Sequence, residues 1–277
     1  MKIKRLIKHN LMRAAMTLAL ILACATAWAS TVLLSADNAP TTWTDGNTYV
    51  SNGVYMYGRI HVQGHVTLEL NSATLWAYQG IVLDWTEEYG IAVLTIKGNG
   101  TLQIPQGSLD NHVPGIAVDN ARLYVEGGHI VVYAGAAAAG IELGNGKLFV
   151  SGGTIEAYPG PPLEEASPTG IHYRYSGGSA IGQAGSLSET GGHYDSWNTL
   201  GGEITISGGT LYLHGDFGEQ YANPTQPANV SIAQCIITIT GGTVYQDVYF
   251  KFFCKQLFLD YDATKNLSVQ FGDDPDP

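Results

Sequence analysis

A Gly-Gly pair that separates two apolar runs recurs along the chain and restricts its fold more than any other feature. The copies are LYVEGGHIVVY (123–133), LFVSGGTIEAY (148–158), ITISGGTLYLH (204–214) and ITITGGTVYQD (237–247). On both sides of the glycines, apolar residues alternate with polar ones, which is typical of strands with one buried face. The pattern therefore predicts pairs of strands joined by a short glycine segment.

The apolar residues that flank each Gly-Gly pair lie five positions apart, as Val125 and Ile130 do. On an unbroken strand, residues five apart point to opposite faces, so the glycines must bend the backbone if both side chains are to reach one core. A two-residue hairpin turn and the corner of a solenoid rung both meet this requirement. The corresponding pairs in the other copies are Val150 and Ile155, Ile206 and Leu211, and Ile239 and Val244.

A second repeated mark favours the solenoid. Gly-Ile occurs at Gly115, Gly140 and Gly170, and the first two of these glycines each precede a Gly-Gly pair by twelve residues. Gly-Ile and Gly-Gly thus recur together, at a fixed spacing from each other, after 25 residues, which defines a repeating unit. Repeats of about 20 to 50 residues are typical of stacked architectures, in which no unit buries its apolar face alone. We therefore expect stacked rungs rather than hairpins.

The first 29 residues have the pattern of an export signal. Five Lys and Arg residues precede an apolar run at 14–25, and Ala27-Trp28-Ala29 matches an A-x-A cleavage site. The run is shorter than the roughly 18 residues that a membrane-spanning helix needs. A second interpretation takes Leu22-Ala23-Cys24 as a lipoprotein signal with Cys24 as the lipidated first residue. Both interpretations predict an exported protein that is secreted, periplasmic or on the cell surface.

The charge of the remaining chain argues against nucleic acid as a partner. Removal of the first 29 residues leaves 8 basic residues against 24 acidic ones, a formal charge of −16. Phosphate binding needs clustered cations, which such a chain lacks. The acidic excess favours solubility, and it is compatible with bound Ca²⁺ without indicating it. We therefore predict no cofactor. The sequence after the signal also contains no further stretch that is long and apolar enough to span a membrane.

Two cysteines remain beyond the signal, Cys235 and Cys254, both on apolar strand faces. Nineteen residues separate them, which is near the length of one rung, so they could stack and form a disulfide in an oxidising compartment. Two buried thiols are the alternative, because spacing alone does not fix the Cα separation.

Four segments between residues 43 and 102 resemble a large group of secreted, adhesin-like bacterial β-solenoid proteins. These proteins open with a W-x-D-G-x-x-Y-V segment, and their later repeats read I-T-I-x-G-G-T-V, as ITISGGTL and ITITGGTV do here. The chain departs from the group where A-G-I-G-G-G units are expected, at AAGIELGNG (138–146) and SAIGQAG (179–185). The matching segments are WTDGNTYV (43–50), IHVQGHVTLEL (60–70), ATLWAYQGI (73–81) and LTIKGNGTL (94–102).

The resemblance implies an all-β fold, a right-handed parallel β-helix, over nearly the whole exported chain. It implies no site residue, because the shared positions are core apolars and turn glycines. We expect one β-helix domain at 30–262 with an irregular N-terminal cap at 30–57 and loop insertions, followed by an acidic tail at 263–277. Asparagines at Asn71, Asn99 and Asn145 suit turns with positive φ.

The regular pattern is interrupted at 159–202 and at 215–228. Loops that project from a rigid solenoid often carry binding sites, and the first interruption is rich in rings and charged groups. Aromatic rings beside polar groups suit sugars, because pyranose faces stack on rings and hydroxyls accept and donate hydrogen bonds. Packing of the rings against the solenoid flank is the alternative. The candidate residues are Tyr158, His172, Tyr173, Arg174, Tyr175, His193, Tyr194 and Trp197.

A second candidate ring pair is Trp76 and Tyr78. They share one strand face, opposite to Leu75, so they face solvent if Leu75 is in the core. This arrangement would form a small exposed stacking strip. Burial of the two rings beneath the loop at Trp85 is the alternative.

Catalysis has little support in the sequence. Lyases and glycosidases on β-helices need carboxylates gathered in a cleft, often with a Lys or Arg base. Here the acids occur about one per rung at outward positions, where solvated charge is the ordinary explanation. We therefore expect a non-catalytic protein that binds glycans or cell surfaces. A lyase or hydrolase and a purely structural stalk remain alternatives. The outward acids are Glu126, Glu142, Glu156 and Glu203.

Overall fold

The computed structural model divides by its contacts into Met1–Ser30 and Thr31–Pro277, and all the strands belong to the second unit. In the part of the chain that the structure describes, every regular element is a β-strand. Side chains are described for residues 29–165, 178–182, 202–215, 217, 235–246 and 256–259. The backbone alone is described for 166, 172–175, 187–189, 218, 220–222, 231–233, 252–253 and 268–271.

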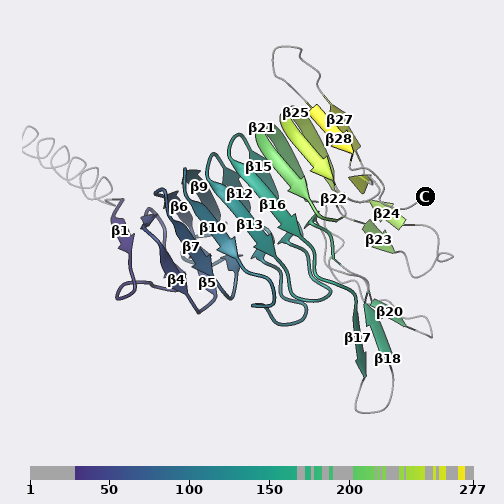
Figure 1. The fold of residues 1–277 in the computed structure, drawn as a ribbon, viewed down its shortest axis with the longest axis horizontal. Helices are drawn as coiled ribbons and strands as arrows, with labels where there is room; N and C mark the ends of the chain where they lie inside the picture. The colour runs from purple at the N-terminus through teal and green to yellow at the C-terminus, as the bar shows by residue number, and fades with distance from the viewer. Residues whose placement is uncertain are drawn as a thin grey trace, which may run out of the picture. The chain divides into compact units, whose positions relative to one another are not determined.

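The largest sheet has two lanes of parallel strands, which run side by side in Figure 1. Lane one consists of β1 (Thr31–Leu34), β3 (Thr48–Ser51), β6 (His65–Leu70), β9 (Val93–Gly98), β12 (Arg122–Val125) and β15 (Lys147–Val150). Lane two consists of β4 (Val54–Met56), β7 (Thr74–Ala77), β10 (Thr101–Ile104), β13 (His129–Tyr133) and β16 (Thr154–Tyr158).

The two lanes join in the long strands β21 (Glu203–Leu213) and β25 (Ile236–Gln246), each of which spans both lanes. The first part of β21 pairs with β15 and its last part pairs with β16. Beyond β25, lane one ends in β27 (Gln256–Leu259) and lane two ends in β28 (Ser268–Phe271), which lies within the stretch expected to be an acidic tail.

A second parallel sheet forms lane three. Because each turn of the chain visits the three lanes and returns beside itself, the fold is a parallel β-helix, as the sequence predicts. Lane three consists of β2 (Thr42–Trp43), β5 (Ile60–Gln63), β8 (Ile81–Asp84), β11 (Ile116–Ala117), β14 (Ile141–Glu142), β19 (Ile181–Gly182), β22 (Phe217–Gly218) and β26 (Phe252–Phe253).

Stacked apolar columns fill the interior. In lane three, Ile60 pairs with Ile81, and the column continues from rung to rung until Phe217 takes the place of isoleucine. Every member of this column is fully buried. β-Branched side chains suit such positions because their single preferred rotamer packs well against the next strand. The column consists of Ile60, Ile81, Ile116, Ile141, Ile181 and Phe217.

The Gly-Gly pairs are corners between lane one and lane two, and the hairpin alternative is wrong. The strands on both sides pair in parallel with the next rung, whereas a hairpin would pair them with each other. All eight flanking apolar residues, including Val125 and Ile130, are buried. The second glycine makes the bend with a positive φ, which is 76° at Gly153. Glycine adopts such values without the steric cost that other residues meet.

The expectation for the asparagines was wrong. Positive φ occurs at the residues beside them, Ser72, Gly98 and Gly144, rather than at Asn71, Asn99 or Asn145. The asparagine side chains instead join neighbouring rungs. Asn71 Nδ2 donates to Asn52 Oδ1 over 2.9 Å, Asn145 Nδ2 donates to Asn120 Oδ1 over 3.2 Å, and Asn99 Oδ1 accepts from the Ser72 hydroxyl over 2.8 Å.

Segments expected to lie outside the regular pattern contribute rungs. The N-terminal cap at 30–57 contains β1 to β4, and its Trp43 is fully buried against Tyr49, with ring centroids 4.8 Å apart. Within both interruptions the chain returns to lane three, as β19 in the first and β22 in the second. Other strands of the two interruptions form small antiparallel sheets: β17 (Leu163–Ala166) with β18 (His172–Tyr175) and β20 (Leu187–Glu189), and β23 (Gln220–Ala222) with β24 (Ser231–Ala233), which follows the second interruption.

Two further expectations concern the membrane and the cysteines. Among the described residues, no helix has the length and hydropathy to cross a membrane. Cys235 is buried in the core, but Cys254 and Cys24 lie outside the described residues. The disulfide and the lipid anchor therefore stay predictions.

The ion pair between Lys147 and Glu203 should contribute little to stability. Lys147 Nζ lies 2.7 Å from Glu203 Oε2, and the two side chains are 36% and 42% exposed. Exposed pairs of this kind are worth about 0.2 to 1 kcal/mol. We expect Lys147→Met to change the free energy of unfolding by less than about 1 kcal/mol in urea titrations. A loss of several kcal/mol would contradict this assignment.

Candidate functional site: an aromatic face on lane two

The outward residues of lane two form two columns rich in aromatic rings, which we name the aromatic face. Strand pairing sets the first column, where Tyr55 lies opposite Trp76 and Tyr212 lies opposite Tyr245. In the second column, Tyr133 lies opposite Tyr158. The face comprises Tyr55, Trp76, Tyr212 and Tyr245 in the first column, and Tyr57, Tyr78, Tyr133, Tyr158 and His214 in the second.

The N-terminal end of the aromatic face carries four rings on two rungs. Tyr55 stacks on Trp76 with centroids 5.9 Å apart and planes 10° apart, and Tyr57 stacks on Tyr78 at 5.2 Å and 23°. Leu75 is buried beneath them, so the parity argument that directs Trp76 and Tyr78 outward is confirmed.

Tyr55 lies in the first strand of lane two, β4, and Tyr57 directly follows this strand, whose partner in the described part of the sheet is β7. Among the described strands, none precedes β4 in lane two to cover the far side of these two rings. Accordingly, Tyr55 is 54% exposed and Tyr57 is 72% exposed. The end of the ring stack is thus open to a flat apolar ligand surface.

A second ring cluster lies further along the same face. Tyr158 is stacked between Tyr133 at 4.1 Å and His214 at 3.9 Å, with the planes nearly parallel. The Tyr158 hydroxyl donates to Glu156 Oε2 over 3.4 Å, and Glu156 Oε1 lies 2.9 Å from His129 Nε2. Burial, then the hydrogen bond with Tyr133 and the negative charge of Glu156, raise the pKa of Tyr158 to about 12.

The raised pKa of Tyr158 gives a pH-dependent prediction. A folded-state pKa above the ordinary value of 10.0 means that the fold favours the neutral phenol, so this stabilisation is complete below pH 10 and is lost as the pH rises toward 12. We expect Tyr158→Phe, which cannot ionise, to lose less stability than the wild type between pH 9 and about pH 11.5 in urea titrations. Parallel losses in the two proteins would contradict the assignment.

The aromatic face combines stacking surfaces with neutral and acidic hydrogen-bonding groups. The lane-two strands from β4 to β25 contain no Lys or Arg. Apolar ring surface beside hydroxyl, imidazole and carboxylate groups can bind the C–H face of a sugar and its hydroxyls. The absence of cations on these strands makes a polyanion a poor ligand for this face.

The structure brings together only part of the residue set predicted from the sequence. Trp76, Tyr78 and Tyr158 lie on the aromatic face. The backbone of His172, Tyr173, Arg174 and Tyr175 forms β18, which pairs with β17, while their side chains are outside the described part of the chain. His193, Tyr194 and Trp197 also lie outside the described residues.

Sequence reasoning missed several rings of the aromatic face. The missed rings Tyr133 and His214 share with the predicted Tyr158 the last position of three successive Gly-Gly copies, so an alignment of the repeats would have placed all three in one column. Tyr55 and Tyr57 carried a weaker signal, because their strand precedes the first Gly-Gly copy. Their pairing with Trp76 and Tyr78 depends on the register of β4 against β7.

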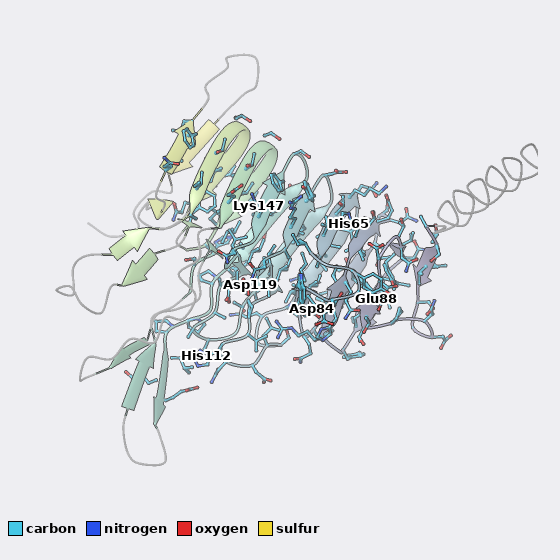
Figure 2. All side chains as sticks on the ribbon, turned by 180° about the vertical axis from the view of Figure 1, so that it is seen from behind. His65, Asp84, Glu88, His112, Asp119 and Lys147 are labelled. Atoms are coloured by element: carbon cyan, nitrogen blue, oxygen red, sulfur yellow. The ribbon has the colours of Figure 1, made fainter. Side chains whose placement is uncertain are left out.

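The described part of lane three also carries carboxylates. Asp84, Asp119 and Glu142 come from successive rungs, and Figure 2 labels the first two. Asp119 Oδ1 accepts from the backbone N–H of Asn145 over 3.3 Å and from Asn120 Nδ2 over 3.2 Å, which fixes a turn. Within the described ranges, no three His, Cys, Asp or Glu side chains are placed to hold a metal ion.

Comparison of the chain with models of protein families, with curated proteins and with solved structures found no match.

Proposed function

We propose that this protein is an exported, non-catalytic β-helix that binds glycans through the aromatic face. The observation that carries the proposal is the open ring stack of Tyr55, Tyr57, Trp76 and Tyr78. Exposed rings on adjacent strands are costly to leave in water, and contiguous apolar surface of this kind marks interaction sites. A soluble sugar polymer suits such a surface because it has both apolar faces and hydroxyl groups.

The rigid placement of the rings also supports binding. Each ring lies in a strand or directly after one, and these strands pair with their neighbours over the buried core. Ligand binding would therefore order few additional groups. Preorganised sites lose less side-chain entropy on binding, which improves affinity for a given contact area. The solenoid places the two ring clusters along one lane, so that an extended polymer could contact both.

A glycan array tests the proposal directly. The exported chain, residues 30–277, would be applied with and without Ca²⁺, and we expect retention on neutral glycans. Each glycan that binds would then be incubated with the protein and examined for shortened or unsaturated products. Retention without products supports a binding protein. Retention on no glycan would overturn the proposal, and release of products would replace it with the lyase or hydrolase alternative.

A further inference from the structure

The first turn of the solenoid has no strand in lane two. Its chain passes from β1 in lane one to β2 in lane three, and between them it forms a turn in which Ser35 pairs with Asn38. The second turn visits all three lanes, as β3, β4 and β5. A position one strand wide is therefore left beside β4, and we name it the lane-two slot.

The edge of β4 that borders the lane-two slot pairs with no described strand. Such an edge presents backbone N–H and C=O groups that a neighbour can bind. The segment that leads to β2 reaches the far end of β4, where a Cβ atom on Gly58 would lie 2.7 Å from Thr41 Cγ2. It leaves Tyr55 and Tyr57 exposed, so that two rings and a strand edge border the same slot.

The open faces of these two rings point toward the N-terminal end of lane two. Tyr55 stacks on Trp76 of the next strand, so the opposite face of the Tyr55 ring borders the slot. The same holds for Tyr57, which stacks on Tyr78. The planes of Tyr55 and Tyr57 are inclined to that of Tyr78 by 33° and 23°. As alternate residues, the two lie about 6.6 Å apart along the chain, and they form a platform two rings wide.

The inward side of the lane-two slot is closed. Val54 and Met56, the inward residues of β4, are each only 2% exposed, although they lie on an edge strand. An added polypeptide strand would direct every second side chain inward, where the core is already covered. A sugar chain has no such alternating side chains. The closed interior therefore favours a glycan over a peptide strand as the occupant.

We propose that a neutral glycan binds in the lane-two slot, with its chain alongside β4 and two successive sugar units stacked on Tyr55 and Tyr57. The inference rests on the proposed function and specifies its ligand as a ribbon-shaped chain, such as β-1,4-linked glucose, whose successive rings lie nearly in one plane. The C–H faces of the sugars contact the two rings, and their hydroxyls form hydrogen bonds with the strand edge.

The opposite arrangement, a chain that runs along lane two across the strands, makes poorer use of the rings. Within a stack, each inner ring covers the faces of its neighbours, as Tyr158 does between Tyr133 and His214. A chain laid across such a stack meets ring edges, whereas sugar C–H groups stack on ring faces. The end of the stack offers those faces.

The dependence of affinity on chain length tests this placement. Glucose, cellobiose, cellotriose and cellohexaose would each be titrated into residues 30–277 in a calorimeter. We expect cellobiose to bind about tenfold more tightly than glucose, because it reaches both rings. Cellohexaose should bind within about threefold of cellotriose, because the further units extend past the platform. Maltohexaose, whose α-linked chain coils, should bind more weakly than cellohexaose.

Tyr57→Ala should lower the affinity for cellobiose about tenfold, to that for glucose. The Tyr57 ring is 72% exposed, so its loss should leave the fold intact, which far-UV circular dichroism would check. Tyr124→Ala is the matched control, because it removes a ring that stacks on Phe149 in lane one. It should bind cellobiose as the wild type does, and equal losses in the two variants would contradict the proposal.

The other outcomes separate this inference from the proposed function. A steady gain from cellotriose to cellohexaose would place the chain along lane two and overturn the slot, while glycan binding would stand. If no cello-oligosaccharide binds but the array retains other neutral glycans, only the ribbon-shaped ligand is wrong, whereas retention of none overturns both proposals. The peptide ATLWAYQG (73–80), which contains the strand that pairs with β4, is the polypeptide probe. Tyr57-dependent binding of this peptide would assign the slot to a polypeptide strand and overturn the proposal.

Discussion

Replacement of Gly153 by alanine should destabilise the protein by about 3 kcal/mol, because two costs add at this corner. Gly153 has a φ of 76°, and a Cβ atom placed there would lie 2.6 Å from the carbonyl oxygen of Gly128 and 2.9 Å from that of Gly127. These are backbone atoms of the preceding rung, so the clash is relieved only if the stacking of the rungs shifts. Urea unfolding, followed by far-UV circular dichroism, would measure the loss.

Gly107→Ala is the matched control for this prediction. Gly107 has a φ of 70°, but an added Cβ would meet nothing within 4 Å. Gly107→Ala should therefore lose only the free energy that a left-handed conformation costs a residue with a Cβ atom, roughly 1 to 2 kcal/mol. If the two variants lost the same free energy of unfolding, the close approach of the Gly-Gly corners on successive rungs would not exclude a Cβ atom there.

Loss of the Trp76 ring should weaken glycan binding at least tenfold. Trp76 contacts both Tyr55 and Tyr78, at 5.9 and 6.5 Å between centroids, so its removal takes away stacking surface and the support of the neighbouring rings. Aromatic residues at the centre of a binding surface commonly account for about 2 kcal/mol or more when truncated to alanine. Isothermal titration of Trp76→Ala with a glycan retained on the array would measure the effect.

Phe149→Ala supplies the control for the Trp76 experiment. Phe149 also stacks outward on a ring, Tyr124, with centroids 4.7 Å apart, but it lies on lane one. We expect this variant to lose a similar amount of ring stacking in the fold and to bind glycans as the wild type does. If Phe149→Ala and Trp76→Ala weaken binding equally, the effect comes from general loss of stability rather than from the aromatic face.

Most of the scaffold could be predicted from the sequence because its rules are local. The five-residue spacing of Val125 and Ile130 across two glycines requires a bend, and the 25-residue phase of Gly115 and Gly140 favours stacking. The structure confirms both the bend and the stacking. The fold class follows from such spacing because a parallel β-helix repeats one short unit, so local parity determines the core of every rung.

The site was less predictable because it depends on which residues share a column across rungs. Parity directed Trp76 and Tyr78 outward, but the rings that stack on them come from β4 and the residue after it, about twenty residues earlier, and the sequence pattern did not fix the register of that strand. Likewise, the emphasis on the 159–202 interruption overlooked that Ile181 returns to lane three.

Hydroxyl-radical footprinting of residues 30–277, with and without a neutral glycan retained on the array, tests the central claim most directly. The method reports the solvent exposure of individual tyrosine and tryptophan side chains by mass spectrometry. We predict that the glycan protects Tyr55, Tyr57, Trp76 and Tyr78, while the lane-one rings Tyr124 and Phe149 react as before. Protection confined to other rings, such as those between residues 172 and 197, with none on the aromatic face, would contradict the account.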